Sequence, residues 1–362
     1  MRRIVIVGGG IAGLSAAWHL ARARAGRISL IERERLLCTH ASGRNAAIFR
    51  PLEAEASLAR LAARSLELFE ELSPGRPLVE LSGLMLLART AAALEPIRHT
   101  ARELGTAHEL EAPECVAARL NELNVRGWYG LYTASGGVID IHGLTETLGK
   151  ASRALGVEIR CGAGPLALKM NDARVLGVET PDGEVVEADD VVLAAGAWNA
   201  EVGRTAGLTL PLTPVRRHLA LLEPRRLMPS TMPVVWSLDD EVYFRREGQR
   251  VLASPCDETA WSARAPQAEL QCVAPLARKL GAIDEGLGRA KVVRHWACLR
   301  TFAPDRRPVI GRDPRVAGVH WLAGFGGFGM TTGVGAGELL ALSFAGQEPP
   351  AGLAVRRLLS RN

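Results

Sequence analysis

The chain has 362 residues, 48% of them hydrophobic and 23% charged, which is typical of a globular protein long enough for one or two cores. Its 44 basic and 39 acidic residues give a net charge of +5, and no aromatic residues interleave with a basic run, which argues against nucleic-acid binding. No apolar run reaches the roughly 18 residues of a transmembrane segment, although peripheral membrane association is compatible with the sequence.

The cysteines and histidines show no spacing typical of a metal or redox site. The six cysteines form no C-x-x-C pair, and no two histidines stand four residues apart beside a carboxylate. This pattern predicts free thiols in a reducing, cytoplasmic compartment and no metal ion. An apolar strand begins at the third residue, so no leader peptide is expected before it.

Residues 1–33 predict a dinucleotide-binding unit. An apolar strand over 3–7 runs into Gly-Gly-Gly-Ile-Ala-Gly, then a helix, then a strand over 28–31. Gly8 would make the tight turn, Gly10 would let a pyrophosphate approach the backbone, and Gly13 would let helix and strand pack closely. The helix N-terminus would attract the phosphates. Glu32 lies where a carboxylate accepts hydrogen bonds from ribose hydroxyls, which disfavours NADP and leaves FAD and NAD open.

A second anion contact is predicted shortly after this unit. Ser42 and Gly43 form a turn, and Arg44 follows it with a side chain whose fork matches a phosphate or carboxylate. The alternative is a plain surface loop. Residues 45–49 look like a tight loop or the start of a helix.

These motifs resemble the D-amino acid oxidase-type superfamily of FAD enzymes. The resemblance rests on Gly-Gly-Gly-Ile-Ala-Gly, the Glu-Arg pair after the second strand and His-Ala-Ser-Gly-Arg-Asn-Ala-Ala. Within that superfamily the chain is most similar to the D-amino acid dehydrogenase and D-arginine dehydrogenase group, over almost its whole length and least over 51–135. The resemblance implies FAD as the cofactor, with further contacts from Ile11, Ala12, Arg33, Ala46, Ala47 and Pro165.

The middle of the chain predicts alternating helices and strands. A turn is expected over 136–140, where Asp140 can cap the next helix. The other elements expected are helices over 53–71, 94–104 and 142–155, one more helix from 114, and strands over 78–88 and 128–133.

The segment from Cys161 fits a second glycine-rich fingerprint, but we reject it as a nucleotide site. Asn171 and Asp172 break the chain where a helix would have to continue, and an antiparallel hairpin over 175–188 follows. FAD enzymes that are reduced by NAD(P)H usually carry such a second fingerprint. The strand after the hairpin ends in small residues that let a flat cofactor lie close, at Ala195, Gly196 and Trp198.

The last third predicts a substrate-side sheet and a final cofactor element. Strands from 213, 236, 251 and 291 are expected to form one antiparallel sheet, with a helix over 267–280. A strand over 319–323, a glycine loop and a helix over 332–344 then aim backbone N–H groups at negative charge, which in the resembled family is the flavin pyrimidine. The contacts expected are Gly326, Gly327, Phe328, Gly329, Met330 and Thr331.

The candidates for catalysis are two arginines and a tyrosine. Arg217 and Arg300 match carboxylate-binding arginines of the resembled group, with Arg300 also at the flavin, and Arg216 competes with Arg217 for that role. Tyr243 matches a pocket tyrosine. The enzyme need only orient the substrate Cα–H toward the flavin N5, which accepts the hydride.

Several departures from the resembled group bear on the substrate. The resemblance places Ile48, Leu84, Met85 and Phe325 at the pocket. The resembled group has a histidine in place of Ile48, an acid near 83–85 and a polar residue by the flavin in place of Phe325. Without the acid a buried cation would be costly, so an apolar or small side chain is predicted. Glu53 stands where the resembled group has a tyrosine in a lid over the pocket. FAD is expected to be non-covalent, with Cys298 as the alternative attachment site.

The fold class expected is α/β with a second α+β domain. A Rossmann-like FAD-binding domain is predicted over 1–50, 136–212 and 300–362, and an antiparallel-sheet substrate domain over 51–135 and 213–299. The predicted reaction is oxidative deamination of a D-amino acid, with oxygen or a quinone as the final acceptor. The alternatives are a glycine- or sarcosine-type secondary-amine oxidase, a 2-hydroxyacid dehydrogenase of the same fold, and a non-catalytic FAD-binding protein.

Overall fold

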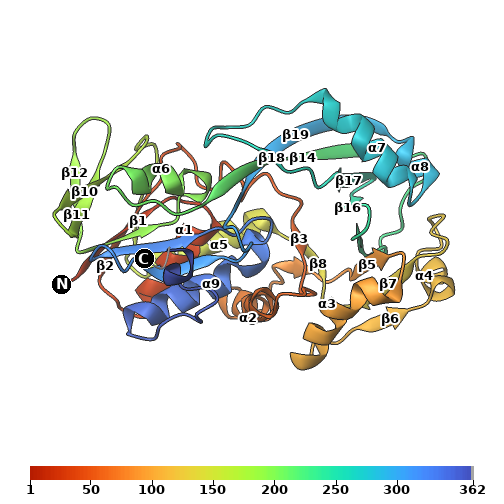
Figure 1. Ribbon diagram of the computed structural model, residues 1–362, viewed down its shortest axis with the longest axis horizontal. Helices are drawn as coiled ribbons and strands as arrows, with labels where there is room; N and C mark the ends of the chain where they lie inside the picture. Colours follow the sequence, from red (N-terminus) through yellow and green to blue (C-terminus); the bar gives the residue numbers. More distant parts are fainter. Residues whose placement is uncertain (360–362) are drawn as a thin grey trace.

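The N-terminal unit forms the middle of a six-stranded sheet in the computed structural model, which describes residues 1–359 (Figure 1). Strand β1 pairs in parallel with β2 on one side and with β13 on the other, and only β20 is antiparallel to its neighbour. In order across the sheet the strands are β20 (Val309–Arg312), β21 (Val319–Ala323), β13 (Asp190–Leu193), β1 (Arg3–Val7), β2 (Arg27–Ile31) and β9 (Glu158–Arg160).

Helices that are far apart in sequence pack together beside this sheet. Helix α1 (Ile11–Arg22) packs on α5 (Ile141–Ala154) and α9 (Gly329–Phe344), and α9 packs on α2 (Ala56–Leu72), as Figure 1 shows. Small residues permit this close approach. A Cβ on Gly337 of α9 would lie 2.0 Å from the Ser15 Oγ of α1. The last helix therefore ties the C-terminal part of the chain to the first unit.

His19 of α1 makes the folding free energy depend on pH. Its side chain is buried, and burial lowers its pKa to about 4. In the unfolded chain the imidazole has its ordinary pKa near 6.5. The contribution of neutral His19 to folding stability is therefore complete above that pH and is lost as the pH falls toward 4. We expect His19→Gln to remove up to about 3 kcal/mol of acid destabilisation between pH 7 and pH 4. Urea unfolding at several pH values measures this, with the exposed His99→Gln as control.

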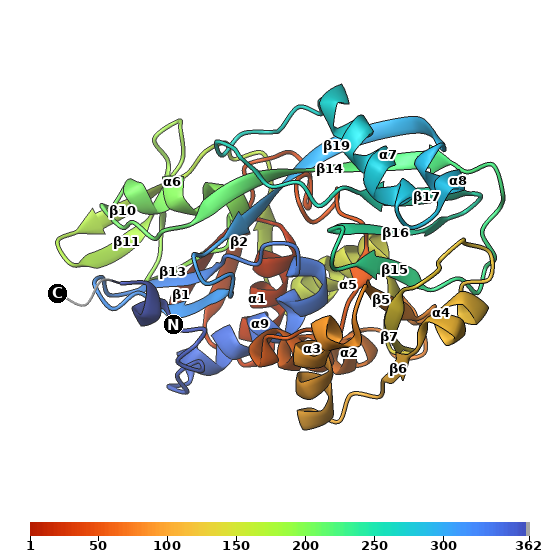
Figure 2. The ribbon, with the colours of Figure 1, turned by 45° about the vertical axis from the view of Figure 1, so that its right-hand side comes forward.

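A larger, nine-stranded sheet extends away from the first one. Its long strands β14 and β19 pair antiparallel from Thr213 against Phe302 to Glu223 against Lys291, and they run side by side in both views (Figures 1 and 2). Its strands are β18 (Thr259–Ala260), β14 (Thr213–Glu223), β17 (Arg250–Ser254), β16 (Val242–Glu247), β15 (Val234–Ser237), β5 (Leu84–Ala88), β7 (Tyr129–Thr133) and β6 (Glu109–Glu111), with β19 (Lys291–Phe302) on the other edge of β14.

Two three-stranded sheets and several short helices complete the described chain. One sheet is β10 (Ala167–Asn171), β11 (Arg174–Glu179) and β12 (Val185–Glu187), and the other is β3 (Ile48–Phe49), β8 (Gly137–Ile139) and β4 (Val79–Glu80). The remaining α-helices are α3 (Ala91–Glu103), α4 (Pro113–Arg119), α6 (Asn199–Arg204), α7 (Val273–Gly281) and α8 (Glu285–Gly288).

The mixed α/β fold class is confirmed, but several predicted elements have different limits. The strand expected over 78–88 is two strands in two sheets, because Gly83 turns the chain with φ +89°. The turn expected over 136–140 contains β8. Helix α7 begins only at Val273, which places Pro275 in its first turn, where a missing N–H costs nothing. The sheet of β14 to β19 is not purely antiparallel, since β15 pairs in parallel with β5.

All six cysteines are free thiols. Among residues 1–359, no helix combines the length and apolar character needed to cross a membrane. The domain boundaries stay a prediction: β14 begins at the limit set at 213, whereas β19 continues without a break through the limit set at 299.

Candidate active site

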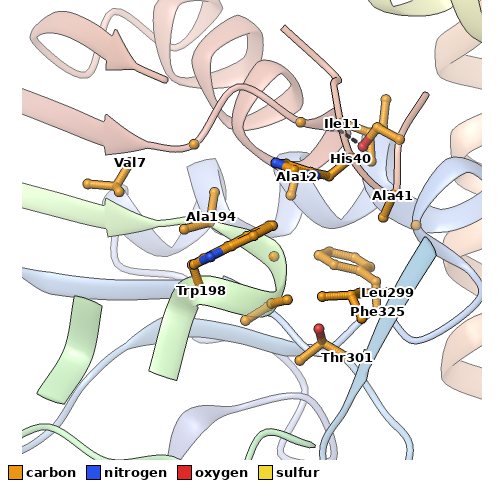
Figure 3. Close-up of a pocket in the computed structure, with 18 of the residues that line it drawn as sticks. Val7, Ile11, Ala12, His40, Ala41, Ala194, Trp198, Leu299, Thr301 and Phe325 are labelled. Atoms are coloured by element: carbon orange, nitrogen blue, oxygen red, sulfur yellow. Dashed lines mark hydrogen bonds between the residues drawn. The ribbon is translucent and has the colours of Figure 1, made fainter. Parts of the chain in front are cut away.

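A cavity of about 310 Å³ opens where β1, β2 and β13 end. The carboxyl ends of parallel strands are where α/β sheets bind nucleotides. Figure 3 shows its walls, with the rings of Trp198 and Phe325 both reaching into the space. The predicted residues that line it are Gly8, Gly10, Ile11, Ala12, Glu32, Arg33, Ser42, Pro165, Ala195, Gly196, Trp198, Arg300, Phe325, Gly326, Gly327, Gly329 and Met330.

Gly8, Gly10 and Gly13 of the fingerprint are each required for a different structural reason. Gly8 has φ +108°, and a Cβ there would lie 2.6 Å from the Ala194 carbonyl oxygen. A Cβ on Gly10 would point at Ser42 Oγ, 3.1 Å away. Gly13 does not line the cavity, because its missing Cβ would overlap the Gly8 carbonyl oxygen at 1.8 Å. Gly8 therefore lets the turn pack closely against Ala194, Gly10 leaves the cradle beside Ser42 open, and Gly13 lets the helix close onto the strand.

Polar groups surround the N-terminus of α1. Ser42 Oγ accepts a hydrogen bond from the Ile11 N–H at 3.0 Å. The buried Glu32 carboxylate accepts hydrogen bonds from the backbone N–H groups of Gly9 and Glu34, the second at 2.8 Å. This network holds Glu32 at the end of β2, where it lines the cavity.

The loop after β2 places its predicted residues differently. The Asn45 amide donates to the carbonyls of Ala41 and Ser42, and this folds the loop back on itself. Ser42 faces the cavity, whereas the side chain of Arg44 is exposed and lines neither cavity described here. Gly43 is also absent from the lining, because it packs on the Cys38 carbonyl. The anion contact of Arg44 therefore stays a prediction, and its side chain lies outside both linings.

Trp198 lies on the wall of this cavity between two other side chains. The Arg33 guanidinium lies 4.9 Å from the Trp198 ring centre, and the His40 ring lies 4.4 Å from it on centroids. The ring thus has a cation and an aromatic group beside it. His40, the first residue of the segment that carries the family resemblance, also lines the cavity, and nothing local in the sequence predicts that it meets Trp198.

A second cavity, of about 410 Å³, adjoins the first and shares Arg300, Gly327 and Met330 with it. It lies between the N-terminus of α9, the loop before α2 and strands of the larger sheet. The predicted residues that line it are Ala46, Ala47, Ile48, Glu53, Arg217, Tyr243, Arg300, Gly327, Phe328, Met330 and Thr331.

Arg300 is a buried cation at the boundary of the two cavities. It is 5% exposed, and its Nη1 donates to Cys298 Sγ at 3.0 Å and to the Leu299 carbonyl at 3.3 Å. Within residues 1–359 it forms no ion pair with a carboxylate. A buried charge without a partner is costly, so its guanidinium is poised for an anion from outside the chain.

The other arginines of β14 differ in direction and pairing. Arg217 lines the second cavity, and its Nη2 donates to Glu258 Oε1 at 2.6 Å. Arg216 points to the other face of the strand, where it pairs with Glu269 and lies over the Trp261 ring at 4.2 Å. Because neighbouring residues of a strand face opposite sides, only Arg217 is beside the cavity.

Aromatic rings and one more ion pair also line the second cavity. The Tyr243 ring packs on Trp236 with centroids 4.5 Å apart, and burial raises the pKa of Tyr243. The Arg50 guanidinium lies 4.2 Å from the Trp236 ring centre, and Arg50 pairs with Glu53. Sequence analysis missed Arg50 and Trp236, and no local motif marks them.

Two predicted pocket residues lie elsewhere. Leu84 and Met85 are fully buried in apolar clusters on the two faces of β5 and line neither cavity, because Gly83 turns the chain before them. Ile48 and Phe325 do line the cavities. Cys298 is 1% exposed and is absent from both linings, so nothing in its placement supports a covalent bond to a cofactor.

The N-terminus of α9 points at the boundary between the cavities. Its first N–H groups, from Gly329 onward, have no acceptor within the helix, as in any α-helix. The glycine loop before it is held close to β19: the Gly326 N–H donates to the Thr301 carbonyl at 2.8 Å. Gly326 has φ +52°, and a Cβ there would overlap Phe302. A sixteen-residue helix thus offers a partial positive charge at this point.

Comparison with known proteins identifies relatives over nearly the whole chain. Residues 3–342 match the family model described as DAO, FAD dependent oxidoreductase. Human mitochondrial dimethylglycine dehydrogenase is 26% identical over 96% of the chain, which spans 43% of that relative. D-amino acid dehydrogenase from Methylobacterium nodulans is 31% identical over 74% of the chain and 64% of its own length. The crystal structure of L-proline dehydrogenase from P. horikoshii superposes with a TM-score of 0.86 at 20% identity, covering 97% and 95% of the two chains.

Proposed function

Since the chain belongs to the DAO family of FAD-dependent oxidoreductases, we propose that it oxidises D-α-amino acids to imino acids, which water hydrolyses to keto acids and ammonia. The family shows an FAD-dependent oxidoreductase, and the relatives that act on amino acids and amines support a donor of that kind. The chain spans less than half the length of the dimethylglycine dehydrogenase that it matches, so the activity of that whole protein is not transferred to it.

The first cavity fits an FAD molecule. Gly8 makes the tight turn, Gly10 leaves the space that a pyrophosphate needs, and Glu32 lies at the end of β2, where a ribose hydroxyl would meet it. The N-terminus of α9 favours negative charge on the flavin ring. When bound, FAD supplies the hydride acceptor at N5. We propose non-covalent binding.

The observation that carries the substrate proposal is the unpaired Arg300. Among the guanidinium groups that line the second cavity, Arg217 and Arg306 share Glu258, Arg50 pairs with Glu53, and Arg307 pairs with Glu55. Arg300 alone among them has no carboxylate partner in residues 1–359, so it calls for a carboxylate on the substrate. Tyr243 lies on the same cavity and offers a hydroxyl group for a further hydrogen bond. These contacts support a substrate that carries a carboxylate.

A small or apolar side chain is the substrate feature that we propose. The missing acid near residues 83–85 no longer supports this feature, because Leu84 and Met85 do not line the cavity. The support comes instead from its walls, where Ile48, Trp236 and Phe328 offer apolar surface.

The test is reduction of bound flavin without oxygen. We expect small and apolar D-amino acids to bleach the flavin absorbance at least ten times faster than their L-enantiomers, D-lysine, N-methyl amino acids or 2-hydroxy acids. Faster bleaching by sarcosine would favour the secondary-amine alternative, for which the similarity to dimethylglycine dehydrogenase is the supporting observation. Faster bleaching by hydroxy acids would favour a hydroxyacid dehydrogenase. Flavin that binds but never bleaches would contradict every enzymatic assignment.

A further inference from the structure

The Glu53 side chain is a buried carboxyl group on the wall of the second cavity. It is 7% exposed and lies in the segment between β3 and α2. Its Oε1 is enclosed and lies 2.5 Å from Arg50 Nε, and its Oε2 accepts a hydrogen bond from Arg50 Nη2 at 3.4 Å. Glu53 lines the cavity, and a carboxylate oxygen accepts more than one hydrogen bond, so this carboxyl group is a place for a donor on the ligand.

Arg50 fixes where this carboxyl group lies relative to the rest of the site. The Arg50 guanidinium lies over Trp236, and Trp236 packs on Tyr243. The backbone N–H of Arg50 meets Thr331 Oγ1 on the first turn of α9 at 3.5 Å. Glu53 is therefore held to the same wall as Tyr243 and beside the helix N-terminus that borders the first cavity.

Glu53 differs from the other carboxylates on the cavity in its pairing and in its pKa. Glu55 is paired with Arg307, and Glu258 is paired with Arg217 and Arg306. The other ionisable groups on the lining are Arg300, Tyr243, Cys256, Glu241 and Asp305. Burial raises the pKa of Glu53 to about 7, against the opposing effect of Arg50. Glu53 thus changes charge near neutral pH, which suits an acid–base group.

We propose that Glu53 accepts a hydrogen bond from the ammonium group of the substrate and then takes its proton. The inference rests on the proposed function. The step converts an ammonium and a carboxylate into a neutral amine and a carboxylic acid, with the proton passing from the substrate nitrogen to a Glu53 carboxylate oxygen. It prepares the reaction because the Cα–H bond loses hydride readily only when the nitrogen lone pair is free to form the imine. Arg300 holds the carboxylate of the same molecule.

A pair of unreactive ligands separates recognition of the amine from recognition of the carboxylate. 2-Aminoisobutyrate has no hydrogen on Cα, so it cannot be oxidised, and 2-methylpropanoate differs from it in lacking the amine. In calorimetric titrations of the FAD-loaded protein, Glu53→Gln is expected to weaken binding of 2-aminoisobutyrate by about 10- to 100-fold and that of 2-methylpropanoate by less than about 2-fold. The exposed Glu70→Gln should change neither.

The pH profile is the second measurement. For the wild type, kcat/KM for a D-amino acid should rise through pH 7 as Glu53 loses its proton, and this rise should vanish in Glu53→Gln. Glu53→Asp should restore part of the rise. Equal weakening of both ligands, or no weakening of either, would overturn the role. A wild type that binds 2-methylpropanoate but oxidises no amine would instead contradict the proposed function.

Discussion

Replacing Arg300 by methionine is expected to lower kcat/KM for a D-amino acid and, at the same time, to raise the stability of the fold. The substrate carboxylate would lose the one buried guanidinium on the cavity that has no partner in the described chain, a loss of about 2–5 kcal/mol, which is roughly 30-fold to several thousand-fold in kcat/KM. Without substrate, however, the same charge is a desolvation cost. Removing it should stabilise the protein by about 1–3 kcal/mol.

Arg216→Met is the matched control for Arg300→Met. Arg216 is equally buried, but it faces away from the cavity and pairs with Glu269. Its loss should lower stability and leave kcat/KM within about 3-fold of the wild type, because a broken ion pair leaves a carboxylate behind without touching the substrate. Steady-state kinetics and thermal unfolding with excess FAD measure both quantities. If Arg300→Met kept full activity, or if it lost stability as Arg216→Met does, Arg300 would not be the carboxylate-binding residue.

The parts of the site that could be predicted from sequence are those in which neighbouring residues determine the geometry. Gly8, Gly10 and Glu32 lie within one strand–helix–strand unit, and local spacing alone brings them to the same cavity. In the same way, once residues 213–223 are predicted to form a strand, alternation places Arg216 and Arg217 on its opposite faces. These predictions needed no knowledge of how distant segments pack.

The parts that failed depend on single turns and on contacts between distant segments. Gly83, in a left-handed conformation, sends Leu84 and Met85 into the core, and a continuous apolar run gives no sign of it. Arg50 and Trp236 are 186 positions apart in the chain and meet only because β15 lies beside the segment before α2. The Arg50–Glu53 pair is close in sequence, yet its place on the cavity depends on Trp236.

Gly13→Ala is expected to abolish FAD binding in an otherwise intact sequence. The added methyl group would lie 1.8 Å from the Gly8 carbonyl oxygen, which is backbone and cannot rotate away. Either α1 moves off the sheet or the turn at Gly8 changes, and in both cases the cradle between Gly8 and Gly10 is lost. We expect destabilisation of about 3–5 kcal/mol and at least about 100-fold weaker FAD binding.

Gly149→Ala on α5 separates this effect from the general effect of adding a methyl group to a helix. Its Cβ would meet the end of the Arg153 side chain at 3.4 Å and Leu37 Cδ1 at 3.9 Å, so alanine should be accommodated and should stabilise the helix by about 1 kcal/mol. Flavin absorbance of the purified variants and titration with added FAD report binding, and urea unfolding reports stability. Because Gly13 does not line the cavity, a yellow, fully stable Gly13→Ala protein would mean that close packing of α1 on the sheet is not what shapes the cradle.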